Sequence, residues 1–328
     1  MNSLFDDTLV ARRCSDGEIS RLSSGRCLVR MCLAATGKSA GLRPSTTGRR
    51  FAAATSIYLC HYPCAVGRIA IAAAMQEEIG ALLAAMTDEQ PVVLGGRQFW
   101  LGHLDGHDVV AVLSRIGKVA AAMTATLLVH EFGAERAIFT GTAGGLRPAV
   151  RVGDVVVASA LLQHDMDASP LFPRHEVPLY GTDRFHADEA LSAALAEAAR
   201  AMLANADAGT DDADLALDAA ELRTFGIVTP RVHSGMVVSG DRFVASASEA
   251  AALRQRLPDA LAVEMEGAAL AQVCHDLGVP FAVVRTISDR ADDSAHVDFS
   301  RFVASIASRY SVGVVRRFLR TGGASAPS

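Results

Sequence analysis

From residue 67 onward, short apolar runs alternate with segments whose apolar residues have helical spacing. Runs of four to eight apolar residues are typical of buried strands, and spacing of three to four residues is typical of helices. The sequence therefore predicts an alternating α/β domain. Its strands are expected at 68–74, 99–104, 108–113, 137–142, 152–157, 231–238 and 281–284, and its helices from 75 and at 119–132, 187–203, 267–277 and 301–319.

The stretch 261–289 carries the most distinctive chemistry. It contains a short apolar run, the tripeptide Glu264-Met265-Glu266, an alanine-rich helical segment, and a buried strand that leads into Arg285 and Asp289. Gly278 and Pro280 stop the predicted helix. In an open parallel sheet, ligands bind beyond the carboxyl ends of the strands, so we expect Glu266, Arg285 and Asp289 to converge there.

Composition narrows the function classes. Residues 1–66 hold nine Lys/Arg and four Asp/Glu, which leaves 22 basic and 32 acidic residues (31 minus 9 and 36 minus 4) in the rest of the chain. This acidic balance disfavours a nucleic-acid partner. No run approaches eighteen apolar residues, so we expect no membrane span.

Cysteine usage bears on the compartment and on metal binding. Five of the six cysteines lie in residues 1–66, and only Cys274 lies later. A secreted disulfide fold would distribute them through the globular part, so the sequence predicts a cytoplasmic protein. Cys60 and Cys64 have no second pair at zinc-site spacing, and His164, Asp165 and Asp167 alternate along the chain, so we expect neither a metal nor another cofactor.

Three segments do not fit the periodic pattern. Residues 1–66 lack periodicity, and we expect a disordered N-terminal extension; a transit peptide and an upstream sequence outside the folded protein, with the true start near Val66, both explain its composition. Residues 205–218 are rich in Ala, Asp and Gly, which is typical of a solvated surface insertion. The catalytic domain is therefore expected at 67–321, followed by a flexible tail at 322–328.

Several motifs together resemble one enzyme family. They are the strand followed by AMQEE at 74–78, SRIGK at 114–118, GTAGGL at 141–146, SGDRF at 239–243, VEMEGAA at 263–269 and VVRTISD at 283–289. In this combination and order the chain is similar to the 5'-methylthioadenosine/S-adenosylhomocysteine nucleosidases of the nucleoside phosphorylase superfamily. The resemblance implies a three-layer αβα sandwich around a mixed, mostly parallel twisted sheet. It also implies a homodimer whose 163–172 segment reaches the neighbouring subunit's pocket.

The resemblance also implies a role for each polar site residue. Glu78 would activate water, Glu266 would bind the ribose hydroxyls as a carboxylate, and Asp289 would protonate the departing adenine. Burial at the end of a strand is expected to raise the pKa of Asp289, with Ser288 orienting it. Arg285 would hold the catalytic constellation, and Thr142, in place of the family's usual Ser, would hold a water.

The apolar site residues would shape the pocket. By the resemblance, Phe243 would stack on the purine, whereas its residue type alone is more typical of a core aromatic. Val244 supplies the backbone that follows the ring, and Met265 forms an apolar wall. Ile116, Leu171 and Phe299, the last from a partner chain, would surround the 5' group and favour a thioether over a phosphate.

Three alternatives remain open on the residues. A phosphorylase would need cationic donors, which the carboxylates after residue 75 oppose, but Arg115 stands where the family usually has Gly. A hydrolase of another nucleoside, such as futalosine or AMP, would differ only around the 5' group. A non-catalytic nucleoside-binding protein would be expected to lack Glu78 or Asp289, and both are present.

Overall fold

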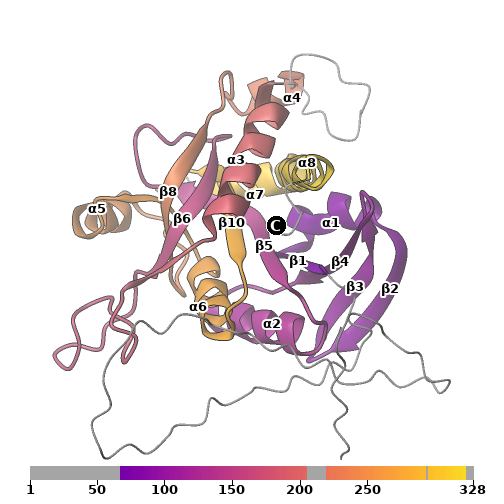
Figure 1. Ribbon diagram of the computed structural model, residues 1–328. Coiled ribbons are helices and arrows are strands. Elements are labelled where there is room, and N and C mark those ends of the chain that lie inside the picture. The colour runs from indigo at the N-terminus through magenta and orange to yellow at the C-terminus, as the bar shows by residue number, and fades with distance from the viewer. Residues whose placement is uncertain (1–66, 205–218, 293–294, 323–328) are drawn as a thin grey trace, which may run out of the picture. The chain divides into compact units, whose positions relative to one another are not determined.

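Alternating side chains of the central strands face two separate hydrophobic cores. In β1 (Ile69–Ala73), Ile69 and Ile71 join one core, while Ala70 and Ala72 join the other. Because successive side chains of a strand point to opposite faces, such a strand is buried only if helices cover both sides of its sheet. The first core includes apolar residues of α1, α3, α7 and α8, and the second those of α2 and α6. The helices therefore form two layers around the sheet, as the sequence predicts (Figure 1).

The computed structural model describes residues 67–204, 219–292 and 295–322. The extension at 1–66, the insertion at 205–218 and nearly all of the tail lie outside the described residues. The helices are α1 (Gln76–Ala84), α2 (Lys118–His130), α3 (Glu189–Ala204), α4 (Ala219–Thr224), α5 (Ala247–Arg256), α6 (Gly267–Leu277), α7 (Ala295–Ser305) and α8 (Ala307–Arg320). The strands are β1, β2 (Thr87–Leu94), β3 (Arg97–Leu104), β4 (His107–Leu113), β5 (Arg136–Gly145), β6 (Val155–Gln163), β7 (Arg184–His186), β8 (Val232–Ser239), β9 (Ala260–Glu264) and β10 (Phe281–Asp289). Within these ranges, every helix falls short of the length and hydropathy needed to cross a membrane.

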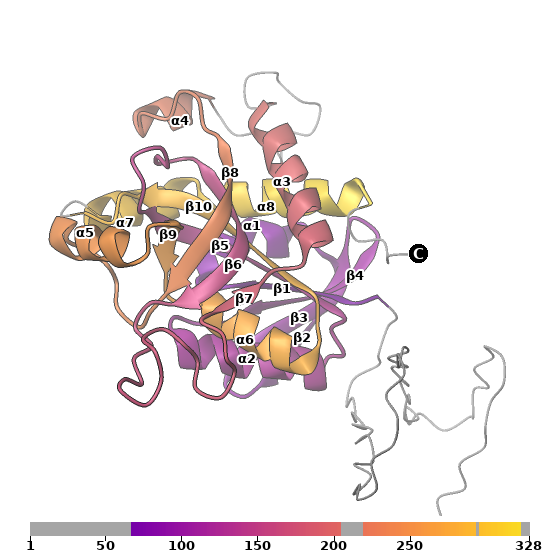
Figure 2. The same cartoon turned by 60° about the vertical axis from the view of Figure 1, so that its left-hand side comes forward.

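The sheet is mixed and partly closes on itself. Strand β1 lies between β4 and β5, and all three run parallel. On its other side β5 pairs with β10 in parallel, and its last residues, Gly144 and Gly145, pair with β9 in antiparallel fashion. Since β9, β8, β6 and β10 are also paired in sequence, β5 belongs to a ring of five strands. Figure 2 shows the β6, β8 and β9 side of this ring.

The ring brings the ends of several strands together. The parallel register of β5 and β10 pairs Thr142 with Thr286 and Gly144 with Asp289. The residues that follow β1, β8 and β9 lie at the same end of the sheet, because these residues line one cavity with Thr142 and Asp289. The fold thus collects at one place the motifs that are separated along the sequence.

The structure differs from the sequence prediction at several elements. Strand β5 continues through the glycines to Gly145, where a loop was expected. The expected final helix at 301–319 is two helices, α7 and α8, which meet at Ile306. Strand β2 and helix α5 were not predicted, because six of the eight β2 residues are exposed and α5 contains Ser, Glu, Arg and Gln among its alanines.

Candidate active site

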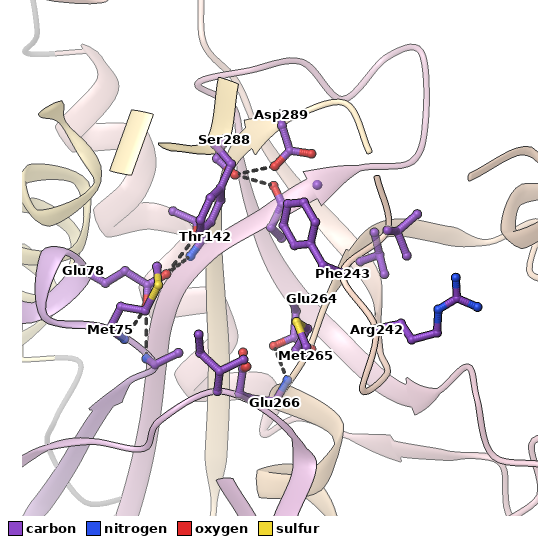
Figure 3. Close-up of a pocket in the computed structure, with 17 residues that line it drawn as sticks. Met75, Glu78, Thr142, Arg242, Phe243, Glu264, Met265, Glu266, Ser288 and Asp289 are labelled. Atoms are coloured by element: carbon purple, nitrogen blue, oxygen red, sulfur yellow. Dashed lines mark hydrogen bonds between the residues drawn. The ribbon is translucent and has the colours of Figure 1, made fainter. Parts of the chain in front are cut away.

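A cavity of about 340 Å³ lies beyond the carboxyl ends of the strands, a volume within the range of small-molecule sites. It receives residues from the turns after β1, β4, β8 and β9, from the ends of β5 and β10, and from α7. Figure 3 shows the side chains of Glu78, Glu266 and Asp289 arranged around it. Its lining includes ten of the twelve residues assigned from the sequence: Glu78, Ile116, Thr142, Phe243, Val244, Met265, Glu266, Ser288, Asp289 and Phe299.

Glu78 is held by four hydrogen bonds on the first turn of α1. Its Oε2 accepts from the backbone N–H groups of Ala74 and Met75 at 3.0 and 3.1 Å. Its Oε1 accepts from the backbone N–H and the hydroxyl of Thr142, both at 2.8 Å. The side chain is buried, with only 3% of the residue exposed, so this carboxylate has one fixed orientation at the edge of the cavity. Thr142 therefore orients Glu78 directly.

Asp289 ends β10 on the wall of the same cavity. It is 2% exposed, and its Oδ2 accepts from the Ser288 hydroxyl at 2.8 Å. Its Oδ1 accepts from the backbone N–H of Ala291, also at 2.8 Å. Gly144 of β5 lies directly opposite: a Cβ there would sit 2.9 Å from Oδ1. The carboxyl group is thus confined by its neighbours, and the sequence prediction that Ser288 orients it agrees with this geometry.

Glu266 lies at the start of α6 and is the carboxylate whose protonation is most perturbed. Burial raises its pKa to about 8, and the negative charges of Glu264 and Glu78 act in the same direction. The charge of Arg285 and a hydrogen bond of 2.9 Å from the Gly117 N–H to Oε1 oppose this rise. Burial thus favours the protonated form of Glu266, whereas the sequence prediction assigned it the ionised form.

Arg285 lies behind the cavity rather than on its wall, unlike the other polar residues predicted for the site. It is 1% exposed, and its Nη2 donates to Glu264 Oε2 at 2.6 Å. Its guanidinium lies 4.2 Å from the centre of the Phe139 ring, in cation–π geometry. Glu264, which the sequence prediction left without a role, is its partner. The sequence did contain a signal for this pairing, because a carboxylate at the end of a buried strand requires a hydrogen-bonding or charged partner.

Aromatic and aliphatic side chains form the rest of the wall. Phe243 is 43% exposed and its ring meets that of Phe299 edge to face, with the centroids 5.5 Å apart. Phe243 is therefore not a core residue, and Phe299 lines the pocket of its own chain rather than that of a partner. Leu171, expected near the 5' group, is 85% exposed and is not among the described residues of the lining.

Two arginines near the cavity that could attract an anion already bind other groups of the protein. Arg115, at a φ of +67°, donates through Nη2 to the carbonyl oxygen of Gly96 in the turn between β2 and β3. Arg242 lines the cavity but forms an ion pair with Glu249. The site that remains is dominated by carboxylates, which disfavours binding of phosphate as a nucleophile.

The segment after β6 uses its polar residues to connect loops. Asp165 accepts from Lys118 Nζ at 2.6 Å and from the Asp241 N–H at 2.9 Å. It therefore connects the start of α2 to the turn that carries Phe243. Among the residues that the structure describes, no group of three or more His, Cys, Asp or Glu side chains is arranged to hold a metal ion.

Comparison with known proteins places this site in a family. A model of the phosphorylase superfamily matches residues 68–320. A 5'-methylthioadenosine/S-adenosylhomocysteine nucleosidase from Neisseria meningitidis, in complex with methylthio-immucillin-A, is 34% identical; the match covers 78% of this chain and 100% of that one, with a TM-score of 0.66. The corresponding enzyme from Colwellia psychrerythraea, in complex with adenine, is 31% identical over 77% of this chain and 94% of that one, with a TM-score of 0.66. A futalosine hydrolase from Helicobacter pylori is 31% identical over 77% and 97%, with a TM-score of 0.64.

The chain belongs to the phosphorylase superfamily. Within it, the chain is a nucleosidase, an enzyme that hydrolyses N-glycosidic bonds, and the resemblance seen in the sequence motifs is confirmed.

Proposed function

We propose that the protein hydrolyses the N-glycosidic bond of 5'-methylthioadenosine and S-adenosylhomocysteine, releasing adenine and the 5'-thio-substituted ribose. The observation that carries this proposal is that Glu78, Glu266 and Asp289 line one nucleoside-sized cavity from three different elements. Cleavage of this bond develops positive charge on the sugar and negative charge on the purine. A site with one proton donor and two carboxylates meets both demands.

In this proposal Asp289 acts on the purine and Glu78 acts on water. Asp289 donates a proton to N7 of adenine as the glycosidic bond breaks, and the Ser288 hydroxyl keeps the carboxyl group in place. Glu78 accepts a proton from a water molecule that attacks the anomeric carbon. The Thr142 hydroxyl fixes the Glu78 oxygen at 2.8 Å, which supports a role in aiming the carboxylate at that water.

Glu266 binds the 2' and 3' hydroxyls of ribose as a carboxylate, with Met265 against the sugar. An ionised carboxylate accepts both hydroxyl protons and stabilises the cationic transition state. Its raised pKa in the empty site means that nucleoside binding is coupled to release of a proton. Phe243 stacks on the purine, with the backbone at Val244 beside it.

Apolar residues support a thioether as the 5' substituent. Ile116 and Phe299 line the cavity and offer no partner to a 5' phosphate, which disfavours AMP. Futalosine is the second candidate substrate, and the similarity to the futalosine hydrolase from Helicobacter pylori, at 31% identity, supports it. With a thioether substrate, the enzyme would serve methionine salvage and removal of the methyl-cycle product in the cytoplasm.

A homodimer would complete the pocket on its open side. Ile116 and Phe243 line the cavity and are nevertheless 56% and 43% exposed. Val119 and Met123, on the following turns of α2, are 82% and 44% exposed. A contiguous exposed apolar surface beside a ligand site is typical of a subunit interface, and a second copy placed here would exclude water from the sugar.

A nucleoside panel in phosphate-free buffer tests the proposed function. Methylthioadenosine, S-adenosylhomocysteine, futalosine and AMP are each incubated with the enzyme, and the free base and the sugar product are identified. We expect adenine and free methylthioribose from methylthioadenosine, at a rate that added phosphate leaves unchanged. Formation of a sugar 1-phosphate that requires phosphate would establish phosphorolysis, and preferential cleavage of futalosine would establish the second candidate.

A further inference from the structure

Glu264 accepts hydrogen bonds from four donor groups at this end of the sheet, yet it has no assigned role. Its Oε1 accepts from the Ser239 hydroxyl, and both its oxygens accept from the Gly267 N–H, at 3.0 and 2.8 Å. Its Oε2 also accepts from the Glu266 N–H at 3.2 Å and from Arg285 at 2.6 Å. These partners come from β8, the β9–α6 turn and β10, so this one side chain connects three segments of the site.

The hydrogen-bond partners of Glu264 favour its ionised form. Backbone N–H groups and a guanidinium can only donate. The Ser239 hydroxyl accepts from the Ala268 N–H at 2.7 Å and donates to Glu264. Four donors, one of them a guanidinium, therefore stabilise the carboxylate, and only 2% of its side chain is exposed.

Arg285, the ion-pair partner of Glu264, also lies close to Glu78, the residue proposed to activate water. A Cβ at Gly141 would lie 3.0 Å from Arg285 Nη1 and 2.9 Å from Glu78 Oε1, so these two groups lie next to each other on the same side of the Gly141 backbone. The Arg285 side chain is 2% exposed and pairs with Glu264, so the position of the guanidinium beside Glu78 depends on the Glu264 charge.

We propose that Glu264 is a positioning residue for the hydrolysis, a permanent buried anion that holds Arg285 beside Glu78 and holds the backbone that presents Glu266 to the sugar. This inference rests on the proposed function of the site. It adds Glu264, a carboxylate that lines the cavity and acts through Arg285 and Glu266 rather than on the reacting atoms.

A consequence distinguishes this role from ordinary structural support. The charged groups that act on Glu266 are Glu264 on β9, Glu78 on α1 and Arg285 on β10, and the first two raise its pKa. Removing the Glu264 charge without changing its shape therefore lowers the pKa of Glu266. A neutral Glu264 that served only as a hydrogen-bonded support would leave this titration where it was.

The test is the Glu264→Gln variant, read out by carboxyl-carbon NMR of the free protein and by kinetics. The Glu266 resonance is assigned by its loss in Glu266→Gln. We expect its titration midpoint, near 8 in the unchanged protein, to move to lower pH, and kcat to fall by about a hundredfold as Arg285 and Glu78 lose their alignment. The matched control is Glu77→Gln, which removes an exposed carboxylate one residue before Glu78 and should change neither quantity.

A second variant covers the case in which the single substitution prevents folding. If Glu264→Gln does not fold because Arg285 is left unpaired, Glu264→Gln/Arg285→Gln replaces the ion pair with two amides. In this double variant kcat should still fall, because Glu78 loses the guanidinium beside it. A midpoint that stays at its original value in folded Glu264→Gln, or an unchanged kcat in the double variant, overturns the inference. The titration needs no substrate. A failure of the proposed function would therefore be seen in a different experiment, in which the protein without substitutions cleaves no nucleoside.

Discussion

Thr142 holds Glu78 through a single oxygen: its backbone N–H and its hydroxyl both lie 2.8 Å from Glu78 Oε1. The hydroxyl bond is the one that a substitution can remove. We predict that Thr142→Val lowers kcat by about ten- to a hundredfold, because a hydrogen bond to a charged group contributes about 1.5–3 kcal/mol. Thr142→Ser should retain most of the activity. Steady-state kinetics with methylthioadenosine measures both variants.

Thr126→Val is the matched control for this prediction. Thr126 is exposed on α2, and its hydroxyl bonds only to the carbonyl of Ala122 in its own helix. Activity should be unchanged in this variant. An active Thr142→Val with normal kcat would show that Glu78 is held well enough by its backbone partners alone.

The raised pKa of Glu266 predicts that nucleoside binding tightens as pH increases. The empty site binds a proton that the sugar must displace, so affinity should rise by about tenfold per pH unit below the pKa of about 8 and level off above it. Calorimetric titration of a non-hydrolysable nucleoside analogue at several pH values measures this slope. An affinity that is flat across this range would contradict the assignment of the ribose contact to the Glu266 carboxylate.

The same group predicts how the stability of the empty protein depends on pH. The folded-state pKa of Glu266 is raised above its ordinary value of 4.5, so the folded protein binds the extra proton. Its contribution to stability is full below the ordinary value and is lost as pH rises through about 8. Thermal unfolding should show a component of this pH dependence that is absent from Glu266→Gln.

The close contact between Gly144 and Asp289 predicts that a side chain at position 144 lowers activity. A methyl group at this position would lie 2.9 Å from Asp289 Oδ1 and 3.0 Å from the Ala291 Cβ, so the carboxyl group must shift. We expect Gly144→Ala to lower kcat by about a hundredfold while the protein still folds, because displacing a catalytic group by about 1 Å has an effect of this size. Kinetics together with a thermal melt separates the two effects.

Gly80→Ala serves as the control for this substitution. Gly80 lies inside α1, and the nearest atom to an added Cβ is the Gln76 side-chain nitrogen at 3.6 Å. Alanine favours helix over glycine by up to about 1 kcal/mol, so this variant should be active and slightly more stable. Equal losses of activity in Gly144→Ala and Gly80→Ala would contradict a specific effect of position 144 on Asp289.

The exposed apolar surface at the start of α2 predicts a dimer. Val119→Asp places a charge on a residue that is 82% exposed, so it should not disturb the fold of one chain. We expect this variant to sediment as a monomer and to lose kcat/KM. Val228→Asp, at a site 77% exposed and remote in sequence, should remain dimeric. A monomeric unchanged protein would contradict the proposed interface.

Periodic apolar residues made most of the fold predictable. Strand β10 was found because its side chains alternate between two cores, and helix α2 because its apolar residues repeat at helical spacing against one of them. The ring was not foreseeable, since β5 and β9 are joined by only two paired residues, Gly144 and Gly145, which read as loop glycines in the sequence. The division of α7 from α8 was equally hidden, because the apolar spacing runs across Ile306.

The site was predictable to the extent that motifs end strands. Glu78 and Asp289 follow or end buried strands, so their meeting at one end of the sheet could be inferred from sequence. The orientation of Arg285 could not, because whether a side chain at a strand end faces the cavity or the interior depends on the twist and the partners of its strand. Its pairing with Glu264 is a contact across 21 residues that depends on the sheet order.

The most direct test is the rate of adenine release from methylthioadenosine, in phosphate-free buffer, by the unchanged enzyme and by Glu78→Gln and Asp289→Asn. Both substitutions keep the shape of a buried side chain and remove its ability to exchange the proton that hydrolysis requires. We predict rapid release by the unchanged enzyme and losses of at least about a thousandfold in each variant, with unaltered circular dichroism. Release within a few-fold of the unchanged rate by either folded variant would contradict the assignment of water activation to Glu78 or of adenine protonation to Asp289.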